Sequence, residues 1–104
     1  IPIMLVLGHT HCGAIKLALE NKLQPGSINH ILNKIQPAVE RVQQRSLQLS
    51  AESLEFEVIK ENALGVVDDL LRESKIIRDR VKSGKTLIVA GLHHLHSGVV
   101  EWFE

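Results

Sequence analysis

The chain has 104 residues, in which 12 Lys and Arg balance 12 Asp and Glu and apolar residues make up 44%. This length and composition predict a single globular domain over residues 1–104. Because the net charge is zero, no positive field is available to attract phosphate backbones, and nucleic acid is not an expected partner. The longest apolar run, from Ile1 to Leu7, is far below the roughly 18 residues of a membrane-spanning helix, so no membrane segment is expected.

The first half of the chain is expected to place one short strand before two helices. A continuous apolar run over Ile3–Leu7 predicts a strand buried on both faces, as in parallel sheets. A helix is expected from Ala14 to a stop at residues 24–26, followed by an amphipathic helix over residues 28–42. Pro37 has no backbone N–H, so we expect it to kink this second helix or to force a restart just before it.

The second half is expected to form a long helix and two more strands. A third helix opens at Ser50 or Ser53, and Ile76 belongs to a continuing or separate short helix. Short strands are predicted over Thr86–Ala90 and Val99–Phe103. Helices that alternate with short strands predict an α/β fold with a mainly parallel β-sheet flanked by helices. Three strands make a narrow sheet, whose open edge normally recruits a partner chain or a further segment.

The most informative stretch follows the first predicted strand, at the edge of the sheet where open α/β folds place their ligand sites. Its sequence is Gly8-His9-Thr10-His11-Cys12-Gly13-Ala14. An imidazole and a thiolate three residues apart in a tight loop can bind the same tetrahedral Zn²⁺, and the glycines let the backbone turn sharply. His9 and Cys12 are therefore the candidate metal ligands.

The single cysteine, Cys12, has further implications. It cannot form an intramolecular disulfide, and it indicates a reducing compartment, with the cytoplasm as the expected location. A His-x-His-x-Asp metallohydrolase motif is excluded because Gly13 stands where Asp is required. A cysteine-phosphatase loop is excluded because Ile15 stands where Gly is required and no Arg follows at the necessary spacing. A redox-active thiol near a helix N-terminus stays open.

Residues 6–16 resemble the second zinc motif of the β-class carbonic anhydrases. Residues 35–40, 61–62 and 84–89 are similar to later segments of that family in the same order, so the resemblance covers essentially the whole chain. It implies a β-carbonic-anhydrase-like fold that is incomplete at the N-terminus, making residues 1–104 a partial domain of that family. It also implies homo-oligomers, because active sites in this family lie at a subunit interface.

By this resemblance, His9 and Cys12 are two of three protein ligands of a catalytic Zn²⁺ whose fourth position holds water. The metal lowers the pKa of that water to about 7, so that it attacks CO₂ and gives bicarbonate in a reversible reaction. The family's third ligand and an Asp-Arg pair belong to an upstream Cys-x-Asp-x-Arg motif, which this sequence lacks. No catalytic residue is therefore assigned, and this chain alone is expected to have impaired activity.

Two alternatives to this function stay open. One is a truncated, non-catalytic interaction or assembly module that keeps the same scaffold. The other is a related enzyme that hydrolyses a different small linear molecule, such as CS₂.

A second group of histidines lies near the C-terminus. Where the family often has a Tyr-Asp-Leu-x-Thr-Gly-like turn, this chain has His93-His94-Leu95-His96-Ser97-Gly98. The spacing of His93 and His96 suits a second metal site, although a turn with solvated histidines is the simpler interpretation. His11 is expected to point away from the metal that His9 binds.

Overall fold

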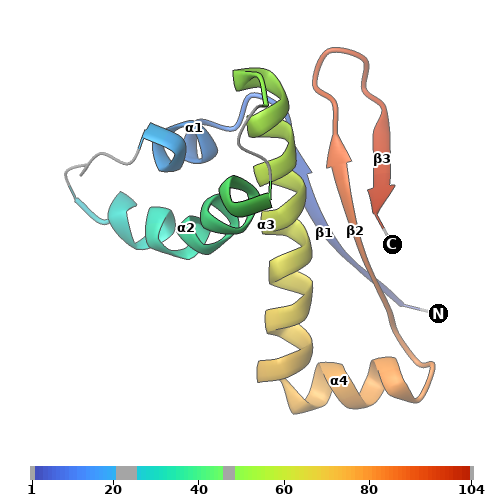
Figure 1. The fold of residues 1–104 in the computed structure, drawn as a ribbon. Coiled ribbons are helices and arrows are strands. Elements are labelled where there is room, and N and C mark those ends of the chain that lie inside the picture. The colour runs from blue at the N-terminus through green and yellow to red at the C-terminus, as the bar shows by residue number, and fades with distance from the viewer. Residues whose placement is uncertain (1, 21–25, 46–48, 104) are drawn as a thin grey trace.

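The computed structural model describes residues 2–20, 26–45 and 49–103. In these residues the α/β class is confirmed: a mixed sheet with one parallel pair of strands is flanked by helices (Figure 1). The elements in chain order are β1 (Ile3–His9), α1 (Gly13–Glu20), α2 (Ile28–Arg45), α3 (Ala51–Glu73), α4 (Lys75–Lys82), β2 (Leu87–His93) and β3 (Val100–Phe103). Most of the predicted stop of the first helix, residues 24 and 25, lies outside the described residues.

The sheet has the strand order β1-β2-β3. β1 and β2 are parallel, in a register that runs from Ile3 opposite Leu87 to His9 opposite His93. β3 is antiparallel to β2, because the chain returns through a tight turn that Gly98 makes with a positive φ of 75°. The three predicted strands are thus confirmed as strands, with β2 extending three residues beyond Ala90 to the level of His9. The prediction that the first strand is buried on both faces is wrong, because the side chains of β1 alternate between exposed and partly buried positions.

One face of the sheet is covered by α3, and α1 and α2 pack on the far side of that helix (Figure 1). Side chains alternate along β1, so Val6 and Gly8 face the helices, where Gly8 meets Ile59 of α3. The buried core lies between these layers and includes Ile15, Leu32, Ile35, Val39, Val42, Val58, Ile59, Ala63, Ala90 and Leu92.

The other face of the sheet is apolar and exposed. Ile3, Leu5 and Leu7 of β1 point to this side, as does Leu87 of β2, and 64% of the Ile3 surface is accessible. Trp102 of β3 lies over Gly91 yet remains 58% exposed. A contiguous apolar surface of this kind is typical of one that another part of an assembly covers.

Pro37 lies inside one continuous helix, so the predicted restart before it is wrong. The proline and Asn33, whose carbonyl loses its helical partner, are both exposed, so water can take the place of the missing hydrogen bond. The buried side chains that follow, Ala38, Val39 and Val42, hold the next turns against the core. Burial on both sides of Pro37 therefore outweighs the loss of one backbone hydrogen bond.

Serine caps define the remaining helices. Ser50, one of two predicted openings of α3, accepts a hydrogen bond from the Ser53 backbone N–H at 3.2 Å. Ser74 interrupts the helical pattern and caps α4 by accepting from the Ile77 N–H, so the short helix is separate. Among the described residues, no helix is both long and apolar enough to cross a bilayer.

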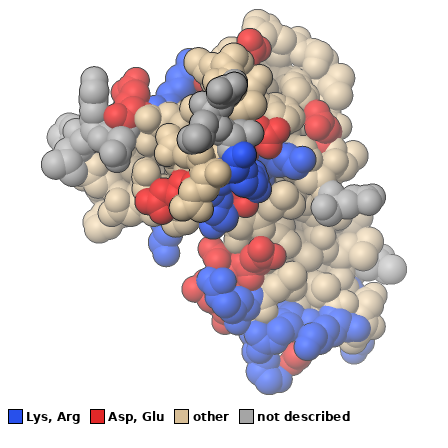
Figure 2. Space-filling model, viewed as in Figure 1, with Lys and Arg blue, Asp and Glu red and all other residues tan. Residues whose placement is uncertain are grey.

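Charged side chains of both signs gather at the end of the molecule that carries α4 (Figure 2). Arg72 pairs with Asp69 at 2.7 Å, and Lys75 pairs with Asp79 at the same distance. Both pairs are exposed and join residues one helical turn apart, so each stabilises the fold by only about 0.3–0.5 kcal/mol.

Glu61 joins α3 to α2 through a partly buried ion pair. Its carboxylate accepts hydrogen bonds from Arg41 at 2.8 Å and from Arg45 at 3.1 Å, and 18% of its side chain is exposed. Burial alone would raise the pKa of Glu61, but the hydrogen bonds and positive charges of Arg41 and Arg45 outweigh it and hold the pKa below the usual 4.5.

This pKa shift predicts how stability depends on pH. Because the folded-state pKa lies below the unfolded one, the ion pair stabilises the fold above about pH 4.5 and the effect is lost as pH falls through the folded-state value. We expect Glu61→Gln to lower the free energy of unfolding by about 1 kcal/mol at pH 7 and by much less at pH 3. Urea unfolding at both pH values measures this, with the exposed Glu40→Gln as control. An equal loss at both pH values would contradict it.

Candidate metal centre

β1 carries the candidate ligands to the carboxyl end of the sheet. The strand ends at His9, and α1 begins at Gly13 after the three-residue loop 10–12. The Cys12 carbonyl accepts a hydrogen bond from the Lys16 N–H at 3.1 Å, so Cys12 is the residue from which α1 starts. The loop thus holds His9 and Cys12 at either end of one tight strand-to-helix connection.

Both candidate ligands border one pocket of about 250 Å³. Val6, Leu7 and Gly8 also line it, and since successive residues of a strand face opposite ways, the pocket spans an edge of β1. β2 occupies the other edge, so the pocket lies along the free edge of β1. The described residues of its remaining wall belong to α1, α2 and α3 and are apolar except for Asn62.

The His9 ring is held by a hydrogen bond that fixes which nitrogen is free. Its Nδ1 lies 2.9 Å from the Thr10 carbonyl oxygen. A carbonyl can only accept, so Nδ1 carries the proton, and in the neutral ring the lone pair is on Nε2. Metal-ligating histidines are commonly oriented by such a bond. His9 therefore has the lone pair of Nε2 available to bind a metal ion.

These residues fit part of a zinc site. An imidazole nitrogen and a thiolate sulfur are ordinary zinc ligands, and a catalytic zinc ion takes three protein ligands and leaves one position for water. In the part of the chain that the structure describes, no three His, Cys, Asp or Glu side chains converge so as to hold a metal ion. His9 and Cys12 lie at a common pocket, but their joint coordination of one ion stays a prediction.

Gly8 lets the strand approach α3 closely just before the loop. A Cβ built on Gly8 would lie 2.6 Å from Cγ2 of Ile59, closer than real Cβ atoms come to another atom, whereas a Cβ on Gly13 would meet nothing within 4 Å. Gly8 is thus required by its contact with α3, and Gly13 is not required by any contact.

This difference gives a matched pair of variants. We expect Gly8→Ala to lower the free energy of unfolding by about 1–3 kcal/mol through overpacking, and Gly13→Ala to leave it nearly unchanged. Adding Ile59→Ala to Gly8→Ala should cost less than the sum of the two single changes, because it removes the atom that clashes. Thermal or urea unfolding of all four variants checks this. If the free-energy changes of the two single variants add up to that of the double variant, the close approach of Gly8 to Ile59 does not affect stability.

The other histidines lie elsewhere. His11 is not among the residues that line the pocket of His9 and Cys12, and its ring lies beside that of His96, with centroids 5.6 Å apart. His93 stands opposite His9 in the parallel register. Sequence reasoning missed the proximity of His11 to His96, and the signal that could have found it is that parallel strands end at the same edge of a sheet.

The chain is similar to known proteins in both sequence and fold. The family model described as carbonic anhydrase matches residues 1–100. No match was found among the curated proteins. The solved structure of the β-carbonic anhydrase CcaA is 26% identical, and the superposition covers 100% of this chain and 52% of that chain with a TM-score of 0.84.

Two further solved structures share the fold. A tetrameric β-carbonic anhydrase from the filamentous ascomycete Sordaria macrospora has a TM-score of 0.87 at 12% identity, with 99% of this chain and 52% of that chain covered. The Coccomyxa β-carbonic anhydrase in complex with acetazolamide has a TM-score of 0.81 at 22% identity, with 99% and 47% covered. The chain therefore spans about half the length of these proteins.

Proposed function

Because this chain belongs to the β-carbonic anhydrase family, we propose that the protein containing it catalyses the zinc-dependent, reversible hydration of CO₂ to bicarbonate. The observation that carries this proposal is that His9 and Cys12 border one pocket at the carboxyl end of a parallel strand. Both lie within the matched residues 1–100. The similarity to CcaA over the whole of this chain supports it.

His9 and Cys12 would hold the zinc ion, His9 through Nε2 and Cys12 through Sγ. When bound, zinc supplies a Lewis acid that makes water a nucleophile at neutral pH. The Thr10 carbonyl accepts a hydrogen bond from Nδ1 of His9 and so leaves Nε2 as the nitrogen that can bind the metal. The apolar side chains of Ile15 and Val66, which line the pocket, suit a small, uncharged and linear substrate such as CO₂.

The third protein ligand has to reach the pocket from outside these residues. Cys12 is the only cysteine of the chain, and the pocket opens along the free edge of β1. A further strand that pairs with this edge would bring its side chains next to His9 and Cys12. The 104-residue chain alone is therefore proposed to bind zinc weakly and to hydrate CO₂ poorly.

The lack of a three-ligand group among the described residues favours one second candidate, a non-catalytic interaction or assembly module on the same scaffold. The two functions differ in metal content. An enzyme binds zinc stoichiometrically when its site is complete, whereas a module leaves His9 and Cys12 without metal and Cys12 open to oxidation.

Substitution of the proposed ligands tests the enzyme. In the purified, zinc-supplied whole protein that contains this chain, rather than in the 104-residue chain alone, we expect His9→Ala and Cys12→Ala each to remove the bound zinc and to lower the CO₂ hydration rate by at least about a hundredfold, since loss of an outer-shell partner already costs 10–100-fold. Zinc is measured by elemental analysis and hydration by stopped flow. His30→Ala, at an exposed position of α2, should change neither.

The results separate the candidates. Zinc-dependent hydration that both ligand variants lose supports the enzyme. A protein that takes up no zinc and hydrates no CO₂ supports the module, and an active protein whose zinc survives both substitutions contradicts the assigned ligands.

We further propose that the protein is a homo-oligomer. The exposed apolar face that carries Leu5, Leu7 and Trp102 supports this proposal, and so does the description of the Sordaria macrospora enzymes as tetrameric. We expect sedimentation equilibrium of the purified protein to give at least twice the mass of one chain. A monomer at micromolar concentration would contradict the proposal.

A further inference from the structure

We propose that His11 and His96 form a second binding site, which takes an exchangeable divalent transition-metal ion such as Zn²⁺ or Ni²⁺. His11 belongs to the loop between β1 and α1, and His96 belongs to the turn between β2 and β3. Neither side chain lines the pocket of His9 and Cys12. The proposal is independent of the catalytic function and rests on the position of these two imidazoles.

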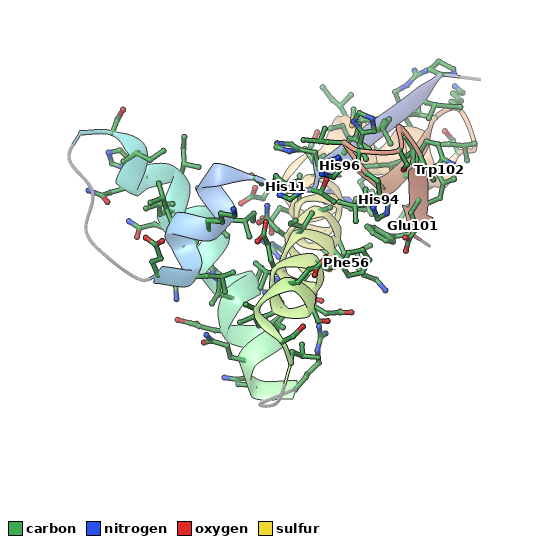
Figure 3. The ribbon with its side chains drawn as sticks, turned by 90° about the horizontal axis from the view of Figure 1, so that it is seen from above. His11, Phe56, His94, His96, Glu101 and Trp102 are labelled. Atoms are coloured by element: carbon green, nitrogen blue, oxygen red, sulfur yellow. The ribbon has the colours of Figure 1, made fainter. Side chains whose placement is uncertain are left out.

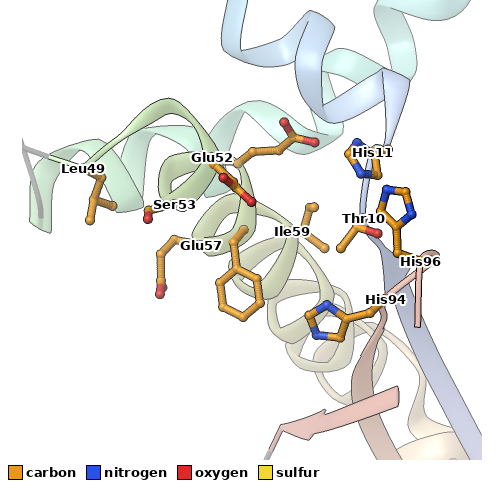
Figure 4. A pocket seen from close by; sticks show the side chains of 11 residues that line it. Thr10, His11, Leu49, Glu52, Ser53, Glu57, Ile59, His94 and His96 are labelled. Carbon is orange, nitrogen blue, oxygen red and sulfur yellow. The ribbon is translucent and has the colours of Figure 1, made fainter. Parts of the chain in front are cut away.

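The separation of the two rings suits a shared metal ion. Their centroids are 5.6 Å apart and their planes are perpendicular. Two imidazoles that bind one tetrahedral ion through nitrogens about 2.0–2.1 Å from it have centroids roughly 5 Å apart. The observed separation of 5.6 Å exceeds that distance by less than about 1 Å. Figure 4 shows the two rings next to each other at the wall of a pocket, near Thr10.

The backbone holds both histidines in place before any ion binds. The Thr10 N–H donates to the His93 carbonyl at 3.1 Å, and the Leu95 N–H donates to the Thr10 hydroxyl at 3.0 Å. His11 has a φ of 57°, in the left-handed region that histidine enters more readily than most residues. Because the loop and the turn are already joined, little ordering is needed on binding.

The surroundings favour a cation. The rings stand at a pocket of about 520 Å³, whose lining includes Glu52, Glu55 and Glu57 of α3. No Lys or Arg is among the described residues that line it. The carboxylates lower the electrostatic cost of a positive ion and would repel bicarbonate or phosphate.

The site offers two protein ligands, with water completing the coordination. His94 lines the same pocket, but its ring stacks on Phe56 at 6.3 Å and its Nε2 lies 3.3 Å from a Glu101 carboxylate oxygen (Figure 3). Over residues 2–20, 26–45 and 49–103 no third His, Cys, Asp or Glu completes a cluster. Two imidazoles and water suit Ni²⁺, Cu²⁺ and Zn²⁺ better than Mg²⁺ or Ca²⁺, and an open site exchanges its ion.

Calorimetric titration with NiCl₂ tests the proposal on the untagged, purified protein. The measurement is made in the wild type and in a His9→Ala/Cys12→Ala background, which lacks the proposed catalytic ligands. We expect one Ni²⁺ ion to bind in the His9→Ala/Cys12→Ala background and at least that one ion to bind in the wild type. In the His9→Ala/Cys12→Ala background, His11→Asn and His96→Gln should each weaken this binding at least tenfold, while His30→Asn leaves it unchanged. Asn tolerates the left-handed backbone at position 11, so the fold is preserved.

Thermal unfolding supplies a second measurement. In the His9→Ala/Cys12→Ala background, added Ni²⁺ should raise the unfolding temperature of the parent and of its His30→Asn variant, but not that of its His11→Asn or His96→Gln variant, because a ligand stabilises the state that binds it. Equal Ni²⁺ binding by this parent and its two site variants overturns the proposal, as does a parent that binds no Ni²⁺. Neither result bears on zinc at His9 and Cys12.

Discussion

The parallel pairing of β1 with β2 is the constraint on which both candidate sites depend. Its register sets His9 opposite His93, so two strands nearly a whole chain apart in sequence end at the same level. The connections that follow them must then leave the sheet side by side, and the Thr10 N–H and hydroxyl hydrogen-bond to His93 and Leu95, at the start of the turn after β2. A shift of one residue in this register would turn the side chains of β1 to the opposite faces and separate the loop from the turn.

Within the described residues the sheet is covered on one side only, and this decides which side chains are accessible. α3 buries Val58 and Ile59 against β1 and β2, while Leu5 and Leu7 on the opposite face remain exposed. His9 continues the exposed row of β1, whereas Cys12 packs against the core beneath the helices. The two proposed zinc ligands thus differ in their surroundings, although both line the same pocket.

The sequence predicted the features that depend on local chemistry. The apolar run before Gly8 predicted β1, and Ser50 is one of the two predicted starts of α3, because caps and periodicity act over a few residues. The sequence alone does not decide whether α4 continues α3, and the cap at Ser74 separates the two helices. The continuity of α2 through Pro37 could not be predicted, since it depends on the burial of Val39 and Val42 against α3. Rules that consider only neighbouring residues in the sequence account for the hydrogen bond that is lost at Pro37. They contain no information on the tertiary contacts of α2 that compensate for this loss.

The two candidate sites also differ in whether the sequence alone could indicate them. His9 and Cys12 could be named as candidates because they lie three positions apart in one loop, and their binding of metal stays a prediction. The approach of His96 to His11, in contrast, depends on the strand register. The left-handed conformation of His11 then explains how residues of one short loop line two different pockets. An extended residue there would follow the alternation of the strand, but the reversal at φ 57° turns its ring toward the β2 turn and leaves Cys12 facing the core. Since Thr10 hydrogen-bonds to that turn and also orients His9, any ion that joins His11 to His96 would stiffen the segment that positions His9.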